Sequence, residues 1–245
     1  MQRARDQFQL VEEAQRTLHA RIATNVREAI VRGELRPGER LKTEEIARQF
    51  GISRIPVREA LHSLVAEGFV TLSPQRGAFV ADLSVEDIEE IYLLRCLLEP
   101  VAARLAVANL TPELVERLVK IVEEMESSEG DQTRWMDLDR SFHLTLYAAS
   151  GRPRLYRIIA QLRANSERYT AIYIASPEYL PGARTRHREL LEAYLRADAD
   201  LAEQRTHQHL QEIERFFIAE LRGRLQGESD QPAPAAGPND RVAPV

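Results

Sequence analysis

The sequence has little of the material on which secreted and membrane proteins depend. It contains one cysteine among 245 residues, Cys96, which excludes a disulfide within the chain. No apolar run approaches the roughly 20 residues that a membrane-spanning helix needs, and the N-terminus lacks a signal-peptide apolar stretch. Secreted domains tend to carry paired cysteines. We therefore expect a cytoplasmic protein with no membrane partner, long enough for one or two domains.

Acidic residues outnumber basic ones, but the excess is unevenly distributed. The whole chain has a formal net charge of -5. Residues 1–80 contain 13 Arg and Lys against 10 Asp and Glu, a net charge of +3, whereas residues 81–245 contain 20 against 28, a net charge of -8. A basic segment joined to an acidic one suggests that attraction to phosphate groups is confined to the N-terminal part.

The stretch 51–68 carries both start and stop signals of a short helix. Ser53 is a residue type that caps helix N-termini, and Pro56 fits the first turn, where a missing N–H costs little. Gly68 supplies a permissive C-terminal stop. The apolar residues recur at helical spacing, which leaves Arg54 and Arg58 one turn apart on another face. These apolar residues are Val57, Ala60, Leu61 and Leu64.

The neighbouring segments complete the outline of a helix-turn-helix with a wing. A first helix starts near residue 18 and ends at Gly33, and Thr43 is expected to cap a short helix over 44–50. Two β-rich runs, 69–72 and 78–80, flank a turn that carries Arg76 and Gly77 at its tip. A small helical domain without DNA-binding function can contain the same pieces, so the pattern leaves both interpretations open. Glu59 would repel phosphate, and we interpret it as structural, paired with a neighbouring arginine.

A resemblance to a known family favours DNA binding. The run from Gly33-x-Leu35-x-Pro37-Gly38 through Ser53-Arg54-x-Pro56-Val57-Arg58-Glu59-Ala60-Leu61 to Glu67-Gly68 closely resembles the winged helix-turn-helix of the GntR family of bacterial transcription regulators. The resemblance covers about residues 20–81. It implies that Ser53, Arg54 and Arg58 contact DNA and that Arg76 and Gly77 enter the minor groove; Lys42 is a further DNA-binding candidate. In fatty-acid-responsive relatives an arginine stands at the position of Glu44, so that contact is not carried over.

A second, all-helical region begins after the junction at 82–84. Ser84 with Asp87 resembles a capping box, and Thr111-Pro112 starts another helix. Further helices are predicted at about 132–149, 153–175, 183–197 and 200–225. The fold class is therefore mainly α: an extension over 1–17, a winged helix-turn-helix with a small β wing over 18–81, an all-helical bundle of six or seven helices over 82–225, and a disordered tail over 226–245.

Within the helical region, one carboxylate and three histidines form a candidate metal site. Asp139 and His143 lie one turn apart on or beside a buried helix face, and the simplest interpretation is a hydrogen-bonded pair in the core. His187 and His209 lie on later helices and could converge with that pair, giving a ligand set that suits a divalent transition metal with open positions. His207 points roughly opposite to His209 and is expected in solvent.

A second resemblance concerns this region. Arg95-x-x-x-Glu99-Pro100, Asp139-x-x-Phe142-His143, Ser150-Gly151-x-Pro153-x-Leu155, His187 and His209 look like the FCD-type effector-binding domain of the FadR-like branch. In that domain the residues matching Asp139, His143, His187 and His209 often bind a metal, which holds a small carboxylate effector. Zinc is our first choice of metal, with nickel and manganese as alternatives.

Three further residues are candidates for binding the effector. The fork of Arg95 suits a carboxylate, and the alternative is a salt bridge to Glu99 one turn away. Ser150 and Arg163 are additional candidates.

Two functions fit these features. The first is a ligand-responsive transcription regulator that, by family resemblance, binds an inverted-repeat operator in double-stranded DNA as a homodimer. The second is a metal-dependent hydrolase acting on a small organic acid, because a metal with open positions activates water. No His-Glu-x-x-His helix supplies a general base, and an enzyme would not explain residues 53–77. We predict a regulator and not an enzyme.

Overall fold

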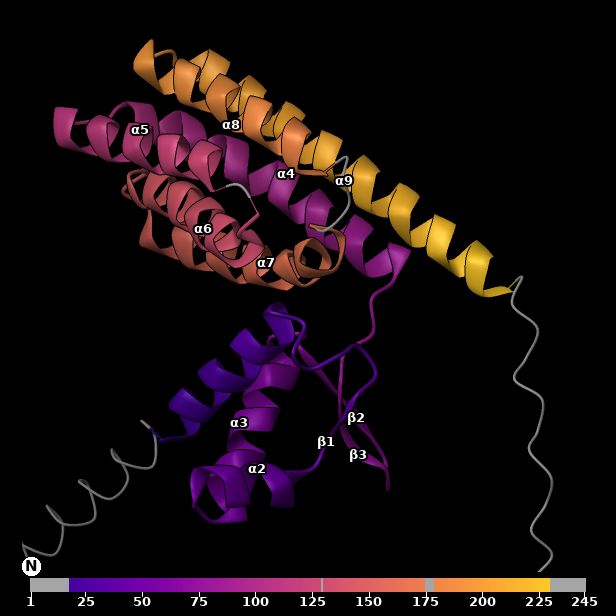
Figure 1. Cartoon of the computed structure of the whole chain (residues 1–245). Coiled ribbons are helices and arrows are strands. Elements are labelled where there is room, and N and C mark those ends of the chain that lie inside the picture. The colour runs from indigo at the N-terminus through magenta and orange to yellow at the C-terminus, as the bar shows by residue number, and fades with distance from the viewer. Residues whose placement is uncertain (1–17, 129, 175–178, 230–245) are drawn as a thin grey trace, which may run out of the picture.

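A small N-terminal head lies beneath a larger helical domain in a computed structural model, which describes residues 18–128, 130–174 and 179–229 (Figure 1). The predicted extension over 1–17 and the tail beyond 229 lie outside the described residues. The head contains a helix over 18–31, followed by β1 (Arg40–Leu41), α2 (Thr43–Phe50), α3 (Arg54–Ala66), β2 (Val70–Ser73) and β3 (Gly77–Val80).

The turn residues of the head set where its elements end. Gly51 has a φ of 66° and accepts the left-handed conformation between α2 and α3, and Gly68 does the same after α3 at a φ of 82°. Ser53 occupies the N-cap position of α3, as predicted, but its side chain makes no cap hydrogen bond. Thr43 does not cap α2, because the helix begins at this residue and Lys42 holds the N-cap position.

The wing is a three-stranded antiparallel sheet in the order β1-β3-β2. The sequence predicts the hairpin of β2 and β3, in which Thr71 pairs with Phe79. It does not predict β1, a two-residue strand too short to show alternation. One apolar core joins the sheet to the three helices of the head, and it includes Ile22, Val57, Leu64 and Phe69, all with no exposed surface.

The helical domain contains six helices within the described residues. They are α4 (Val85–Val107), α5 (Pro112–Ser127), α6 (Gln132–Ala148), α7 (Pro153–Tyr173), α8 (Tyr179–Leu195) and α9 (Ala199–Ser229). The expected caps at Ser84 and Thr111 are formed, since each side chain accepts a hydrogen bond from the backbone three residues on. The predicted fold class is confirmed. The disordered tail was placed too early, because α9 continues to residue 229.

The helical domain has its own apolar core, and one of its layers of helices faces the head (Figure 1). Helix α4 packs along α9, while α6 and α7 form the layer nearest the head (Figure 1). The core includes Trp135, Phe142, Tyr147 and Phe217, each at most 1% exposed. None of the described helices combines the length and apolar character that crossing a membrane requires.

Candidate functional site

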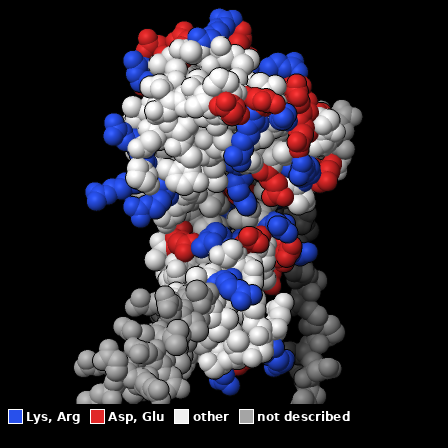
Figure 2. Space-filling view, turned by 90° about the vertical axis from the view of Figure 1, so that its left-hand side faces the viewer, with Lys and Arg blue, Asp and Glu red and all other residues white. Residues whose placement is uncertain are grey.

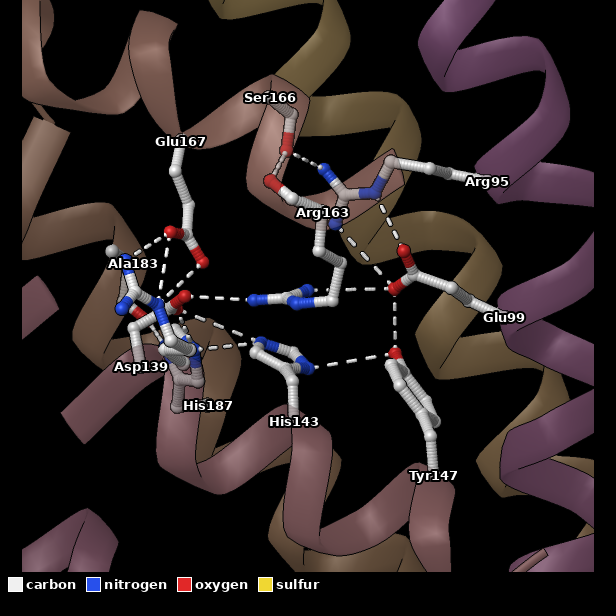
Figure 3. Close-up of polar contacts among 11 residues, drawn as sticks. Arg95, Glu99, Asp139, His143, Tyr147, Arg163, Ser166, Glu167, Ala183 and His187 are labelled. Carbon is white, nitrogen blue, oxygen red and sulfur yellow. Dashed lines mark hydrogen bonds and ion pairs between the residues drawn. The ribbon is translucent and has the colours of Figure 1, made fainter. Parts of the chain in front are cut away.

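Three helices bring three histidines together at the centre of the helical domain. His143 of α6, His187 of α8 and His209 of α9 each offer a ring nitrogen, and these nitrogens lie within 4.8 Å of one another. All three side chains are at most 3% exposed. Asp139 lies beside them: its Oδ1 is 2.9 Å from His187 Nε2 and 3.6 Å from His143 Nε2 (Figure 3). The four residues predicted as a metal site therefore lie together.

The hydrogen bonds around His187 leave an acceptor atom facing the centre of the cluster. His187 Nδ1 lies 2.7 Å from the carbonyl oxygen of Ala183, which only accepts, so this nitrogen carries the hydrogen. In a neutral ring His187 Nε2 is then an acceptor, yet it faces Asp139 and lies 3.1 Å from His143 Nε2. A lone pair facing a carboxylate is unfavourable unless a cation, a proton or a metal ion, lies between them.

The charge states around the cluster match those of metal ligands. Burial lowers the pKa of His143 and His209 well below the usual value, so both rings are neutral near pH 7. Burial acts to raise the pKa of Asp139, but its surroundings, which include the Arg163 guanidinium 2.8 Å from Oδ2, hold the pKa well below the usual value, so Asp139 remains a carboxylate. His209 Nδ1 is buried without a hydrogen-bond partner among the described residues. Neutral imidazoles beside a carboxylate fit a divalent transition metal.

A buried acid, Glu99 of α4, gathers the polar groups on the other side of the cluster. Its side chain has no exposed surface. Arg95 Nε donates to Glu99 Oε1 at 2.6 Å, Tyr147 Oη donates to Oε2 at 2.7 Å, and Arg163 Nη1 lies 3.5 Å from Oε2 (Figure 3). Burial acts to raise the pKa of Glu99, but the two arginines outweigh it and keep the acid ionised.

The three effector candidates differ in their surroundings. Arg95 makes the salt bridge to Glu99 that was the alternative to effector binding, and its Nη1 donates to Ser166 Oγ at 2.8 Å. Arg163 contacts one of the predicted metal ligands directly, because its Nη2 donates to Asp139 Oδ2 at 2.8 Å. Arg163 Nε is buried without a hydrogen-bond partner in the described part of the chain. Ser150 lies in the turn after α6, where its hydroxyl accepts from the backbone N–H of Arg152.

Sequence reasoning missed the roles of Tyr147 and Ser166. Tyr147 lies one turn after His143 on the same buried face, a spacing that could have indicated a partner for the site. Ser166 carried no local signal, because its contact with Arg95 joins residues 71 positions apart.

The predicted DNA-facing residues all lie at the surface of the head. Arg58 is exposed on α3, and Arg76 is exposed in the turn between β2 and β3, with its guanidinium 5.4 Å from the Phe79 ring centroid. Arg54 is exposed near the start of α3, and Glu44 Oε1 lies 3.1 Å from its Nη1. Lys42 is exposed and pairs with Glu45 at 2.8 Å.

The charged surface of the head is mixed, with basic side chains at its far end. Figure 2 shows Lys and Arg at the end of the head farthest from the helical domain. Acidic and basic side chains lie together where the head meets the helical domain (Figure 2). Glu59 was expected to pair with an arginine; its partner is instead His19, whose Nδ1 lies 4.0 Å from Glu59 Oε2. His19 lies on the first helix of the head and Glu59 lies on α3, so the residues near Glu59 in sequence did not indicate this pair.

Family models match both parts of the chain. The model described as "Bacterial regulatory proteins, gntR family" matches residues 18–80, and the model described as "FCD domain" matches residues 90–212, half of the chain. The chain belongs to the GntR family of bacterial transcription regulators. Its C-terminal part is an FCD domain.

Proteins similar to this GntR-family member are also regulators. The HTH-type transcriptional regulator McbR of Escherichia coli (strain K12) is 33% identical over 148 residues, which cover 60% of this chain and 67% of McbR. The Nta operon transcriptional regulator of Aminobacter aminovorans is 37% identical over 134 residues, 54% of this chain and 62% of the relative. The matched proteins are transcription regulators and not enzymes, which confirms that part of the prediction.

Solved structures agree with the fold. E. coli McbR/YncC superposes with a TM-score of 0.74 at 27% identity, covering 83% of this chain and 98% of that one. A putative GntR regulator from Rhodococcus sp. RHA1 gives a TM-score of 0.71 at 25% identity, over 82% and 97% of the two chains. The arrangement of a winged head and an FCD domain is thus shared across most of the chain.

The salt bridge between Arg95 and Glu99 predicts a large effect on stability. Arg95→Leu leaves Glu99 buried with one charged partner fewer, and breaking a buried ion pair costs about 3–5 kcal/mol of unfolding free energy. Urea denaturation followed by circular dichroism measures the change. Lys120→Ala serves as the control, because it removes an exposed pair with Glu116 and should leave the midpoint nearly unchanged. Equal midpoints for both variants would contradict this role of Arg95.

Proposed function

We propose that this GntR-family regulator binds an inverted-repeat operator as a homodimer and that a small carboxylate effector, held at a metal on Asp139, His143, His187 and His209, modulates DNA binding. The observation that carries the proposal is the cluster of three buried histidines beside an ionised aspartate, in a chain whose head exposes the predicted recognition residues. The two separate apolar cores support a division into a head over 18–81 and an effector domain over 82–225.

The recognition surface supports DNA reading by α3 and the wing. Arg54 and Arg58 are exposed near the N-terminus of α3, where an arginine can pair bidentately with guanine in the major groove. Ser53 and the free N–H groups of the helix start suit a phosphate, as does Lys42, and Arg76 with Gly77 extends toward the minor groove. Glu44 beside Arg54 would orient that guanidinium and discourage binding to arbitrary sequences.

The proposed role of Arg58 predicts that its substitution removes specific DNA binding but not metal binding. Arg58→Ala should abolish specific binding, because each bidentate arginine–guanine pair contributes about 1–3 kcal/mol of discrimination in each half-site. The measurement is a gel shift with a duplex selected by the wild-type protein from random sequences. Metal content should stay at the wild-type level. Arg154→Ala removes the same charge from the exposed first turn of α7 and should bind as the wild type does. Retained specific binding by Arg58→Ala would refute the recognition role.

The metal would be held by ligand atoms that have few other binding partners inside the protein. Three imidazoles and Asp139 provide nitrogen and oxygen ligands, and a divalent ion would relieve the unfavourable contact between His187 Nε2 and Asp139. A metal bound there supplies a Lewis-acidic centre for a carboxylate ligand. These considerations fit zinc, nickel and manganese, and zinc remains our first choice.

Histidines two residues apart on α9 provide a matched test of the metal site. His209→Ala should lower bound metal from about one ion per chain to near zero after dialysis, because it removes a buried ligand. His207→Ala alters an exposed ring on the same helix and should retain the metal. Metal analysis by mass spectrometry measures both. Equal metal content in the two variants would rule out His209 as a ligand.

Arg163 is better placed than Arg95 to meet the effector. The guanidinium of Arg95 is committed to Glu99 and Ser166. Arg163 contacts Asp139 and has a buried Nε with no hydrogen-bond partner in the described residues, so it retains a donor for an incoming carboxylate. Ser150 makes a local turn contact, and nothing in its surroundings links it to the cluster.

An exposed apolar stripe on α4 supports the homodimer. Leu93, Leu94, Leu97 and Val101 are 60%, 40%, 61% and 44% exposed, although they follow one another on a single helix. Such a stripe marks an interaction surface. Because α4 follows the head directly after Ser84, pairing two copies of α4 about a twofold axis would bring two heads together, as an inverted repeat requires.

The dimer interface predicts a change in mass. Leu97→Glu places a charge in the stripe and should convert the dimer into a monomer of 27.9 kDa. Light scattering after size-exclusion chromatography measures the mass. Ile158→Glu is the control, since Ile158 on α7 is 52% exposed outside the stripe. If the Leu97 variant stays dimeric, the stripe is not the interface.

A further inference from the structure

One short stretch of α7, residues 163–169, contacts both the metal-ligand cluster and the head. On the cluster side, Arg163 donates to Asp139, and Arg95 donates to Ser166 Oγ, which in turn donates to the carbonyl oxygen of Arg163 at 2.8 Å. Arg163 and Ser166 are each 4% exposed. Any displacement of these buried side chains therefore acts directly on the backbone of α7.

The same stretch touches the end of the recognition helix. Asn165 Nδ2 donates to the carbonyl oxygen of Glu67, the C-cap residue of α3, at 2.9 Å. The approach is close, because a Cβ on Gly68 would lie 3.7 Å from the Asn165 side chain. Ala164 of α7 and Met136 of α6 pack against the apolar core of the head. The contact combines a specific hydrogen bond with apolar packing.

Arg168 strengthens the contact at the next turn. Its guanidinium lies 5.6 Å from the ring centroid of Phe69, a residue of the head core with no exposed surface. The same guanidinium pairs with Asp87 at 3.0 Å, in the first turn of α4. Arg168 thus joins the head to the start of the helical domain and fixes both to α7.

Helix geometry makes these contacts interdependent. After Pro153 at its start, α7 contains no proline or glycine, so nothing in the sequence breaks it between the two sides. Arg163 and Asn165 are two residues apart, a rise of about 3 Å, and they point to roughly opposite faces. A shift or rotation of α7 would change the contact of Arg163 with Asp139 and the contact of Asn165 with Glu67 together.

We propose that Asn165 and Arg168 are positioning residues that transmit the occupancy of the histidine cluster to the C-terminal end of α3. Asp139 presents Oδ2 to Arg163 and Oδ1 to the histidines, and a divalent ion on Oδ1 would draw negative charge from the carboxylate and weaken its bond to that guanidinium. Arg163 would then move α7, and the contact of Asn165 with Glu67 would loosen. This inference rests on the proposed metal site, and it requires that the two placements of the head differ in DNA affinity.

Hydrogen–deuterium exchange of the full-length protein with zinc alone tests the inference. Zinc should speed amide exchange over residues 65–70 of the wild type by about 5- to 150-fold, the usual size of coupling between sites. Asn165→Ala should bind zinc as tightly as the wild type, by calorimetry, but its exchange over 65–70 should respond less than twofold. Arg168→Lys keeps the charge but not the planar stacking on Phe69, and its response should be reduced.

The matched control is Asn109→Ala. Asn109 Nδ2 donates to the carbonyl oxygen of Ala149 at 2.8 Å, the same type of bond within the effector domain, so this variant should respond as the wild type does. The same comparison applies to affinity for the selected duplex, where the zinc-dependent change should disappear only with Asn165→Ala and shrink with Arg168→Lys. Zinc binding without any change over 65–70 of the wild type would overturn the inference and leave the metal site standing. Failure to bind zinc would overturn both.

Discussion

The helical domain depends on keeping a charged group, Glu99, in its interior. A carboxylate with no exposed surface is tolerated only because Arg95, Arg163 and Tyr147 surround it. These partners come from α4, α6 and α7, so the acid fixes three helices relative to one another. The arrangement also commits Arg95 to a structural role. The remaining arginine, Arg163, contacts both Glu99 and Asp139, so it links the buried acid to the histidine cluster.

Within the part of the chain that the structure describes, the histidine cluster lacks hydrogen-bond donors for some of its buried acceptor atoms. His187 Nδ1 lies 2.7 Å from a backbone carbonyl oxygen, His209 has a buried nitrogen without a partner in the described residues, and Asp139 stays ionised beside them. A core of this kind is more favourable with a cation than without one. The hydrogen bonds and charges of this chain thus favour a cation at the position that the family resemblance implies.

Much of the fold could be predicted from local signals, and the failures share one cause. Ser84, Thr111 and the glycines after α2 and α3 act within one turn of the backbone, and the elements that they bound were predicted to within a few residues. The strand β1 was missed because a two-residue strand exists only through its partner β3. The partners of Glu59 and Arg54 were also missed, since each pair joins different helices.

The site shows the same division between local and distant information. The spacing of Asp139 and His143 placed both on one face, but sequence could only suggest that His187 and His209 would meet them. The resemblance supplied that convergence, whereas the contacts of Tyr147 and Ser166 required the packing of α6 and α7 against α4. The pairing of Arg163 with Asp139 required the packing of α7 against α6.

The location of the contact with the head follows from this packing. Because α7 holds Arg163 against the cluster, its opposite face is the one that remains available to the head, and that face carries Asn165 beside Ala164. A contact at the C-terminal end of α3 leaves the N-terminal end, with Arg54 and Arg58, exposed to solvent. Helix α3 is therefore held at its C-terminal end by α7 and exposed at its N-terminal end, so the proposed movement at Glu67 would change the direction in which the two arginines point.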